Sequence, residues 1–289
     1  MRIRKAVLPV AGLGTRVLPA SKVVPKELLP LVDKPTLQYI VEEAVEAGIE
    51  EIIFVTSRSK RSIEDHFDSF PELEQVLERK GKHKELEELR HVQKMTTYTA
   101  VRQPEPLGLG HAVLCAKELV GNEPFVVMLG DELVAPETPC LPLMLEIYEK
   151  YNGSVLSLFT SPPELISSYG IASVNELETN VVQVTDLVEK PPRDEAPSDL
   201  AVAGRYILTP DIFAILERTP PGRGGEIQVT DAIQQQAEAG HCYGLRFTGI
   251  RYDTGNPLGL LTTSIAYALK RPDIAPALRE YMREALNTP

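Results

Sequence analysis

The sequence has only three cysteines among its 289 residues, and Cys115, Cys140 and Cys242 stand far apart. An odd and widely spaced set indicates neither a disulfide framework nor a CxxC metal site. Long apolar runs are missing as well. No uncharged stretch approaches the ~20 apolar residues of a membrane span, and the apolar stretch near the first residue is shorter than the core of a signal peptide. We therefore expect a cytoplasmic protein that does not associate with a membrane.

Positive charge is also in short supply. Lys and Arg number 30 against 41 Asp and Glu, which gives a formal net charge of −11. Broad binding of nucleic acid or of an anionic membrane needs a basic surface, so the charge argues against both kinds of partner. An anionic small molecule remains compatible, because a few cations can gather in one cleft. The length allows one enlarged α/β domain or two small ones.

The first half of the chain alternates predicted strands and helices. Apolar residues 6–10 predict a strand that ends at a glycine loop. Residues 37–45 repeat apolar side chains at i, i+3, i+4, i+7 and i+8, which predicts an amphipathic helix before the next strand at 52–56. Such a βαβ unit implies parallel pairing. A second unit is predicted at 98–102, 110–119 and 125–129.

The rest of the chain is less regular. The charged stretch 62–94 predicts helices that break near Gly81 and present a solvated face, although such an insertion could also pack against a second subunit. We expect one domain over 1–289, with an N-terminal half at about 1–135, a C-terminal half at about 136–270 and a C-terminal helix at about 272–287. The predicted strands of the second half are 154–160, 170–174, 181–188 and 201–208, with helices at about 210–217, 229–239 and 257–270.

The glycine loop after the first strand is the main chemical signal. Residues 11–16 read Ala-Gly-Leu-Gly-Thr-Arg, and glycines there let backbone N–H groups approach an anion without an obstructing Cβ. The dinucleotide fingerprint GxGxxG needs glycine where Val17 stands, and the GK[ST] of a Walker A loop is absent. Instead Arg16, Lys22 and Lys26 follow, which predicts an anion site rather than a plain turn with solvated cations.

These residues resemble the signature of the sugar-phosphate nucleotidyltransferases. The segments VDKP at 32–35 and LQYIVEEAVEAGI at 37–49 are similar to the uridylyltransferase branch of that family, and the resemblance extends over nearly the whole chain. It implies a Rossmann-like three-layer α/β/α sandwich with a mainly parallel, mixed central sheet. The N-terminal half would bind nucleotide and the C-terminal half sugar phosphate. The family pattern GxGTR followed by PK is filled by Gly12, Gly14, Thr15, Arg16, Pro25 and Lys26.

The resemblance also implies a reaction, in which UTP and α-D-glucose 1-phosphate give UDP-glucose and pyrophosphate with Mg²⁺ as cofactor. A homodimer or homotetramer is expected. Two alternatives stay open: a dTTP-dependent or other sugar-1-phosphate nucleotidyltransferase, and a non-catalytic regulatory protein that binds nucleotide or sugar phosphate. The intact predicted catalytic residues argue against the second alternative; they are Arg16, Lys26, Asp131 and Lys190.

By resemblance, the nucleotide contacts fall on the glycine loop and on the GLGHA loop at 108–112. Gln103 would read the edge of uracil, because a carboxamide offers both a donor and an acceptor. His111 is interpreted as structural, since a phosphate nucleophile needs no general base. The predicted nucleotide-binding set is Ala11, Gly12, Leu13, Gly14, Thr15, Glu27, Gln103 and Gly108.

Two aspartates are candidate metal ligands. Asp131 ends a buried strand at the carboxyl edge of the sheet, where open α/β sheets bind ligands, and a carboxylate beside a triphosphate suits Mg²⁺. The resemblance makes Asp131 the metal ligand and Asp253 a second metal-facing candidate, although the Asp-Thr-Gly at 253–255 is also ordinary turn chemistry. A metal role for Glu132 is left open.

The sugar-phosphate contacts are also assigned by resemblance. Glu189 would bind sugar hydroxyls and Lys190 the sugar phosphate. Gly204 would let the sugar ring lie close to the backbone, with Arg205 structural or near phosphate. Segment 226–231 could cap a helix through Thr230 or Asp231, shape the site, or do both. The predicted sugar-phosphate set is Gly130, Glu189, Lys190 and Gly204.

Overall fold

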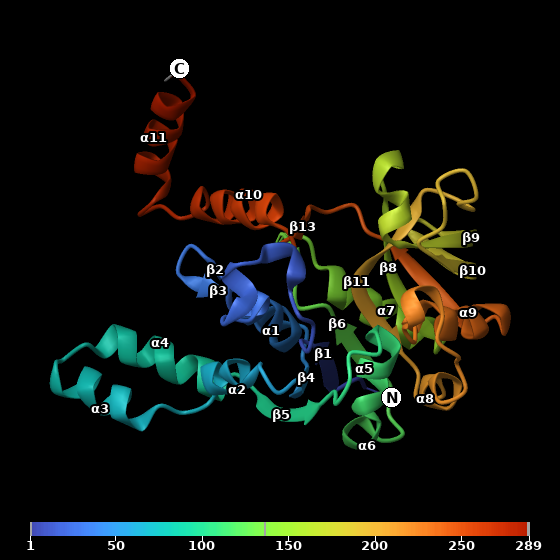
Figure 1. Ribbon diagram of the computed structural model, residues 1–289, viewed down its shortest axis with the longest axis horizontal. Helices are drawn as coiled ribbons and strands as arrows, with labels where there is room; N and C mark the ends of the chain where they lie inside the picture. Colours follow the sequence, from blue (N-terminus) through green and yellow to red (C-terminus); the bar gives the residue numbers. More distant parts are fainter. Residues whose placement is uncertain (1, 136, 288–289) are drawn as a thin grey trace.

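A nine-stranded sheet crosses the whole molecule in the computed structural model, which describes residues 2–135 and 137–287. Its strand order is β5-β4-β1-β6-β11-β8-β12-β10-β9 (Figure 1). The small strands β2 (Pro30–Leu31) and β3 (Lys34–Pro35) pair separately, as do β7 (Glu132–Val134) and β13 (Arg251–Asp253). The strands of the large sheet are β1 (Lys5–Pro9), β4 (Glu51–Thr56), β5 (Thr97–Arg102), β6 (Phe125–Met128), β8 (Ser154–Thr160), β9 (Gly170–Glu178), β10 (Val181–Glu189), β11 (Leu200–Leu208) and β12 (Cys242–Arg246).

Parallel pairing dominates the N-terminal half of the sheet. β5, β4, β1 and β6 are parallel neighbours, as the two predicted βαβ units require. β11 runs antiparallel to β6 and to β8, while β12 is parallel to β8 and antiparallel to β10. β9 is antiparallel to β10, so within this sheet β10 and β11 run against the other strands. The prediction of a mixed sheet is confirmed, with its parallel pairing concentrated in the N-terminal half.

Helices cover both faces of the sheet and complete three layers. On one face, α1 and α7 pack their apolar side chains, among them Leu37 and Met144, onto the strands. On the other face, α5, α8 and α9 do the same with Val113, Phe213 and Ile233. The helices are α1 (Thr36–Glu46), α2 (Arg61–Phe67), α3 (Pro71–Arg79), α4 (His83–Lys94), α5 (Leu109–Cys115), α6 (Lys117–Val120), α7 (Cys140–Tyr151), α8 (Ile212–Leu216), α9 (Val229–Glu238), α10 (Pro257–Ala268) and α11 (Ala275–Asn287).

Two parts of the chain extend from this body. Figure 1 shows α3 and α4 reaching outward beyond α2, and α11 standing apart at the C-terminal end. Gly81, with φ of +66°, separates α3 from α4, which confirms the predicted break. In the described ranges, no helix combines the length and the apolar character that crossing a membrane requires.

Candidate active site

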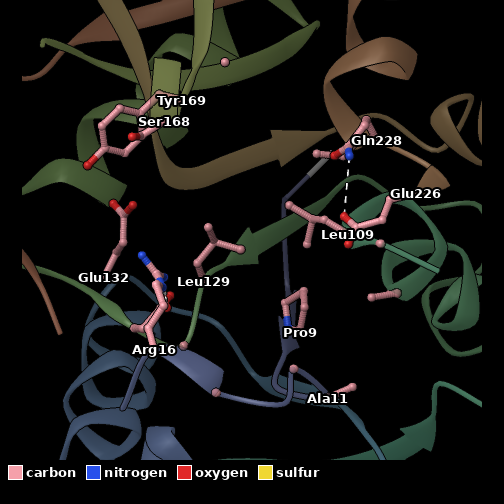
Figure 2. Close-up of a pocket in the computed structure, with 18 of the residues that line it drawn as sticks. Pro9, Ala11, Arg16, Leu109, Leu129, Glu132, Ser168, Tyr169, Glu226 and Gln228 are labelled. Carbon is pink, nitrogen blue, oxygen red and sulfur yellow. Dashed lines mark hydrogen bonds and ion pairs between the residues drawn. The ribbon is translucent and has the colours of Figure 1, made fainter. Parts of the chain in front are cut away.

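A cavity of about 870 Å³ opens where the chain leaves β1, β5 and β6. Figure 2 shows its two ends, with Ala11 and Leu109 far from Ser168 and Tyr169. The sequence-predicted residues that line it are Ala11, Gly12, Leu13, Gly14, Thr15, Arg16, Lys26, Glu27, Gln103, Gly108, Gly130, Asp131, Glu189, Lys190 and Asp253. Residues more than 200 positions apart in the sequence therefore meet around one space.

The glycine loop is folded back on itself directly after β1. Gly14 has a φ of +67°, and a Cβ there would lie 3.1 Å from the Cβ of Ser21. The Ser21 hydroxyl donates a 2.7 Å hydrogen bond to the Gly14 carbonyl and holds the bend. Glycine is favoured at this position because a side chain would be strained by the positive φ. The bend brings Arg16 and Lys26 to the same side of the cavity.

Asp131 lies between these two cations. Its Oδ2 is 2.5 Å from Lys26 Nζ and 3.6 Å from Arg16 Nη2. The Asp131 carbonyl accepts hydrogen bonds from both the backbone N–H and the hydroxyl of Thr254. This pair of bonds ties the β13 turn, which carries Asp253, to the end of β6.

The two predicted metal ligands converge on the open side of Gly255. A methyl group on Gly255 would lie 2.7 Å from Asp131 Oδ2 and from Arg16 Nη2, and 3.0 Å from Asp253 Oδ1, so a larger residue would disturb this group of charges. Asp253 is held by the backbone N–H of Gly255 and by the amide of Asn256. Mg²⁺ commonly uses one or two carboxylates and keeps several waters, so this donor set fits a divalent cation that a substrate phosphate shares.

Gln103 sits at the other side of the glycine loop. Its backbone N–H donates to the Thr56 carbonyl and extends the β4–β5 ladder, and its side-chain Nε2 donates to the Gly108 carbonyl at 3.0 Å. Gly108 has a φ of +99°, and a Cβ there would lie 2.8 Å from the Ile227 carbonyl. The loop before α5 is therefore tightly packed against residues 226–227, which fixes the place of Gln103.

Glu189 and Lys190 form the far end of the cavity. The Glu189 carboxylate accepts a 2.7 Å hydrogen bond from the Thr230 hydroxyl and lies 2.9 Å from Lys190 Nζ. Lys190 has a φ of +45°, which is uncommon outside glycine, and its N–H donates to the Tyr169 carbonyl at 3.0 Å. The structure thus holds this lysine in a strained conformation at the cavity wall.

Two residues of the predicted site, Lys22 and Gly204, do not line the cavity, and Lys22 is exposed. A Cβ on Gly204 would lie 2.9 Å from the side chain of Leu129, and Leu129 itself lines the cavity. The expected close approach of a sugar to Gly204 is therefore wrong, because Leu129 covers it. From the same strand, Val202 and Tyr206 line the cavity instead.

Two neighbours of Gly204, Arg205 and Glu132, are held by charged partners from the protein itself, although Glu132 also lines the cavity. Arg205 is 1% exposed and pairs with Glu43 of α1 at 2.6 Å, so it does not reach a phosphate. Glu132 accepts a 3.0 Å hydrogen bond from the Gly204 N–H and pairs with Arg251 at 3.0 Å. Burial raises the pKa of the Glu132 carboxyl against the charge of Arg251. These bonds already engage Glu132, so we assign it no metal.

The predicted capping role of segment 226–231 is also wrong. Residue 228 precedes the first turn of α9, and both Thr230 and Asp231 lie inside that turn. Thr230 instead turns its hydroxyl to Glu189, while Glu226 and Gln228 line the cavity and bond to each other, as Figure 2 shows. The segment shapes the site.

Glu27, which was predicted to contact the nucleotide, is almost fully buried. It is 1% exposed, and its Oε2 accepts a 2.8 Å hydrogen bond from Lys60, which is itself 4% exposed. Burial raises the pKa of Glu27 against the charge of Lys60. Glu27 lines the cavity, but its carboxylate is paired with Lys60. Contact of Glu27 with a base stays a prediction.

Three residues at or near the cavity were not among the predicted site residues. Lys60 reaches Glu27 only through the fold. Tyr169 supports Lys190 through its carbonyl, and its hydroxyl accepts a 2.9 Å hydrogen bond from Arg251, whose guanidinium lies 3.9 Å from the ring centroid of Phe159. The position of Arg251, two residues before Asp253, was the one available indication of its place.

Cations and convergent carboxylates around one cavity of an α/β sheet are typical of enzymes that transfer phosphoryl or nucleotidyl groups. The chain belongs to the nucleotidyl transferase family, whose model matches residues 5–269. It is 50% identical over 286 residues to the UTP–glucose-1-phosphate uridylyltransferase of Bacillus subtilis (strain 168), covering 99% of this chain and 98% of that protein.

Solved structures show the same likeness. The UTP-bound UGPase from Acinetobacter baumannii superposes with a TM-score of 0.91 at 43% identity, covering 98% of this chain and 99% of that one. A UDP-glucose pyrophosphorylase complexed with UDP-glucose gives a TM-score of 0.85 at 44% identity, covering 93% of this chain and 100% of that one. The expected family and fold are therefore confirmed.

Proposed function

We propose that this chain transfers the uridylyl group of UTP to α-D-glucose 1-phosphate and so forms UDP-glucose and pyrophosphate. The observation that carries the proposal is the division of one cavity between Arg16 and Lys26 at the glycine loop and Lys190 at the end of β10. Two anionic substrates need separate cations in one space. The named activity of the Bacillus relative and the nucleotides in the two related structures support the choice of substrates.

The proposed chemistry is an in-line attack of the sugar phosphate oxygen on the α-phosphorus, with pyrophosphate as the leaving group. Because the nucleophile is already an anion, the protein has to bring two anions together and stabilise the charge that develops. Arg16 and Lys26 are assigned to the triphosphate and Lys190 to glucose 1-phosphate. Glu189, which Thr230 orients, is assigned to the sugar hydroxyls.

Mg²⁺ is the proposed metal, with Asp131 and Asp253 as its protein ligands. When bound, it would neutralise phosphoryl charge. The convergence of Asp131 and Asp253 oxygens beside Gly255 supports this assignment. Lys26 already contacts Asp131 Oδ2, so the chain holds this carboxylate in place with a cation of its own.

A matrix of nucleotides and sugar 1-phosphates tests the proposal by pyrophosphate release. We expect UTP with glucose 1-phosphate to give the highest kcat/KM. A higher value with dTTP would identify the dTTP-dependent alternative, and no release with any pair would support the non-catalytic one. The Asp273→Asn variant, altered at an exposed carboxylate outside the cavity, serves as a matched control for preparation effects.

We further propose that residues 1–289 act as one cytoplasmic catalytic unit and that copies of it associate as a homodimer or homotetramer. The large sheet continues through both substrate halves, which supports a single unit. Exposed apolar side chains on α10 and α11, including Leu258, Leu261, Tyr281 and Leu286, support association. Light scattering of the purified chain measures the assembly, and a monomer at micromolar concentration would contradict it.

A further inference from the structure

His111 is a polar residue of the cavity region to which the proposed mechanism gives no role. It lies in the first turn of α5, and its Nδ1 is 3.1 Å from Nε2 of Gln103. The same Nε2 donates to the Gly108 carbonyl at 3.0 Å. A carbonyl oxygen can only accept, so the Gln103 atom facing Gly108 is the amide nitrogen and not the oxygen.

This arrangement fixes the tautomer of His111. Since the Gln103 amide donates, Nδ1 of His111 has to accept, which places the ring proton on Nε2. That nitrogen lies 3.9 Å from the Cys115 sulfur, a weak acceptor one turn further along the same helix. The neutral Nε2–H form of His111 therefore satisfies both of its neighbours.

The consequence concerns which atom Gln103 offers to a ligand. An amide NH₂ has two hydrogens, and Gly108 and His111 take both of them. In the described parts of the chain, the hydrogen bonds of this side chain engage only its nitrogen, so Oε1 is left as the acceptor on the cavity wall. We propose that His111 is a positioning residue that holds the Gln103 amide so that its oxygen reads a base carrying an N–H at position 3.

This proposal rests on the proposed function, because it explains the choice of a uracil nucleotide. Uracil carries a hydrogen on N3, whereas cytosine has a lone pair there. Oxygen facing N3 is therefore attractive for UTP and repulsive for CTP. Without His111, only the Gly108 carbonyl still holds the amide nitrogen. With one of its two anchors lost, the side chain can more often turn its nitrogen toward the base. Selection against cytosine should then fall.

The test compares kcat/KM for UTP and for CTP at saturating glucose 1-phosphate. His111→Leu removes the acceptor, and we expect the UTP/CTP ratio to fall at least tenfold, with the KM for glucose 1-phosphate unchanged. His111→Asn can place an amide oxygen near the former Nδ1, and we expect it to keep the ratio within threefold of the starting protein. In a Gln103→Ala background, His111→Leu should change the ratio no further, because the effect passes through Gln103.

His66→Leu is the matched control. His66 also faces a glutamine amide, with its Nε2 3.1 Å from Gln38 Oε1, but it is not part of the described cavity wall. An unchanged ratio in His111→Leu, or an equal fall in His66→Leu, would overturn the proposal. The proposed function fails separately, if the unaltered chain does not use UTP with glucose 1-phosphate at all.

Discussion

The ammonium of Lys26 lies 2.5 Å from Oδ2 of Asp131, so a proposed phosphate-binding cation and a proposed metal ligand touch each other directly. Arg16 lies 3.6 Å from the same oxygen. The cations neutralise the carboxylate in the structure described, and a triphosphate with its metal would draw them toward its own oxygens. The nucleotide and the metal should therefore bind in a mutually dependent way.

Replacing Asp131 by Asn should remove most of the turnover and leave the fold intact. The exchange keeps the shape and removes the charge that faces the metal, so we expect kcat to fall by at least about 100-fold, the size of a lost transition-state contact. Pyrophosphate release over a Mg²⁺ titration measures the effect, with Asp273→Asn as the control. Near-normal activity that still requires Mg²⁺ would place the metal elsewhere.

Lys26 and Lys190 should differ in the substrate that each one serves. Lys190→Ala should raise the KM for glucose 1-phosphate by roughly 10–100-fold and that for UTP far less, because a charge-assisted contact is lost at one substrate only. Lys26→Ala should mainly lower kcat, since charge on the leaving pyrophosphate grows in the transition state. Steady-state kinetics with each substrate varied separately distinguish the two. Damage to UTP binding alone in Lys190→Ala would refute the assignment of the cavity ends.

Gly255→Ala should block the space between the carboxylates without changing any charge. The added methyl would lie 2.7 Å from Asp131 Oδ2 and from Arg16 Nη2, which is too close for an undisturbed site. We expect a loss of turnover of at least about tenfold, given that small displacements in a site are costly, together with weaker Mg²⁺ activation and a nearly unchanged melting temperature. Full activity at the usual Mg²⁺ concentration would show that the metal does not use this space.

Lys60→Met should lower stability in a pH-dependent way. It leaves the buried Glu27 carboxylate without its partner, which typically costs about 3–5 kcal/mol of unfolding free energy. Because the pKa of Glu27 is already raised by burial, the folded protein binds more protons at this group than the unfolded chain does, and stability falls as the pH rises. Removing Lys60 raises that pKa further, so the deficit should be largest at alkaline pH and shrink toward the ordinary carboxyl range of about 4–5.

Denaturant unfolding of Lys60→Met across pH measures this deficit. Lys84→Met, altered at an exposed lysine of α4, is the control and should lose little at any pH. The double variant Glu27→Gln with Lys60→Met removes both charges and should recover much of the loss. A deficit that is equal at pH 5 and pH 9 would mean that Glu27 does not carry the effect.

Much of the fold could be predicted from local patterns. The apolar spacing of residues 37–45 predicted α1, and the unbroken apolar run near 125–129 predicted a fully covered β6. The helix α7 was missed, although Leu141, Met144 and Tyr148 follow helical spacing, because Pro142 in its first turn and the absence of a capping residue obscured it. β12 was missed for another reason. It is a short strand with Gly244 in its middle, and only its distant partners β8 and β10 define it.

In the candidate site too, residues that are close in sequence could be predicted and contacts between distant segments could not. Residues grouped by sequence, such as Gly14 with Arg16, could be found because short spacing alone brings them together. Lys60 and Tyr169 could not, because only the packed sheet brings them to Glu27 and Lys190. The prediction for Gly204 failed because the sequence shows only that this position has no side chain. It does not show that the side chain of Leu129 fills the space beside it.

The pairing of β6 with β11 joins the two proposed substrate halves by a hydrogen-bonded ladder. Rotating one half against the other would break that ladder, so the spacing between the nucleotide end and the sugar end is set when the chain folds. Closure around substrates has to come from surface segments, such as the one after β1 where Leu13 and Val23 are exposed. Ligands should therefore slow amide hydrogen exchange in that segment while the exchange of β6 and β11 stays the same.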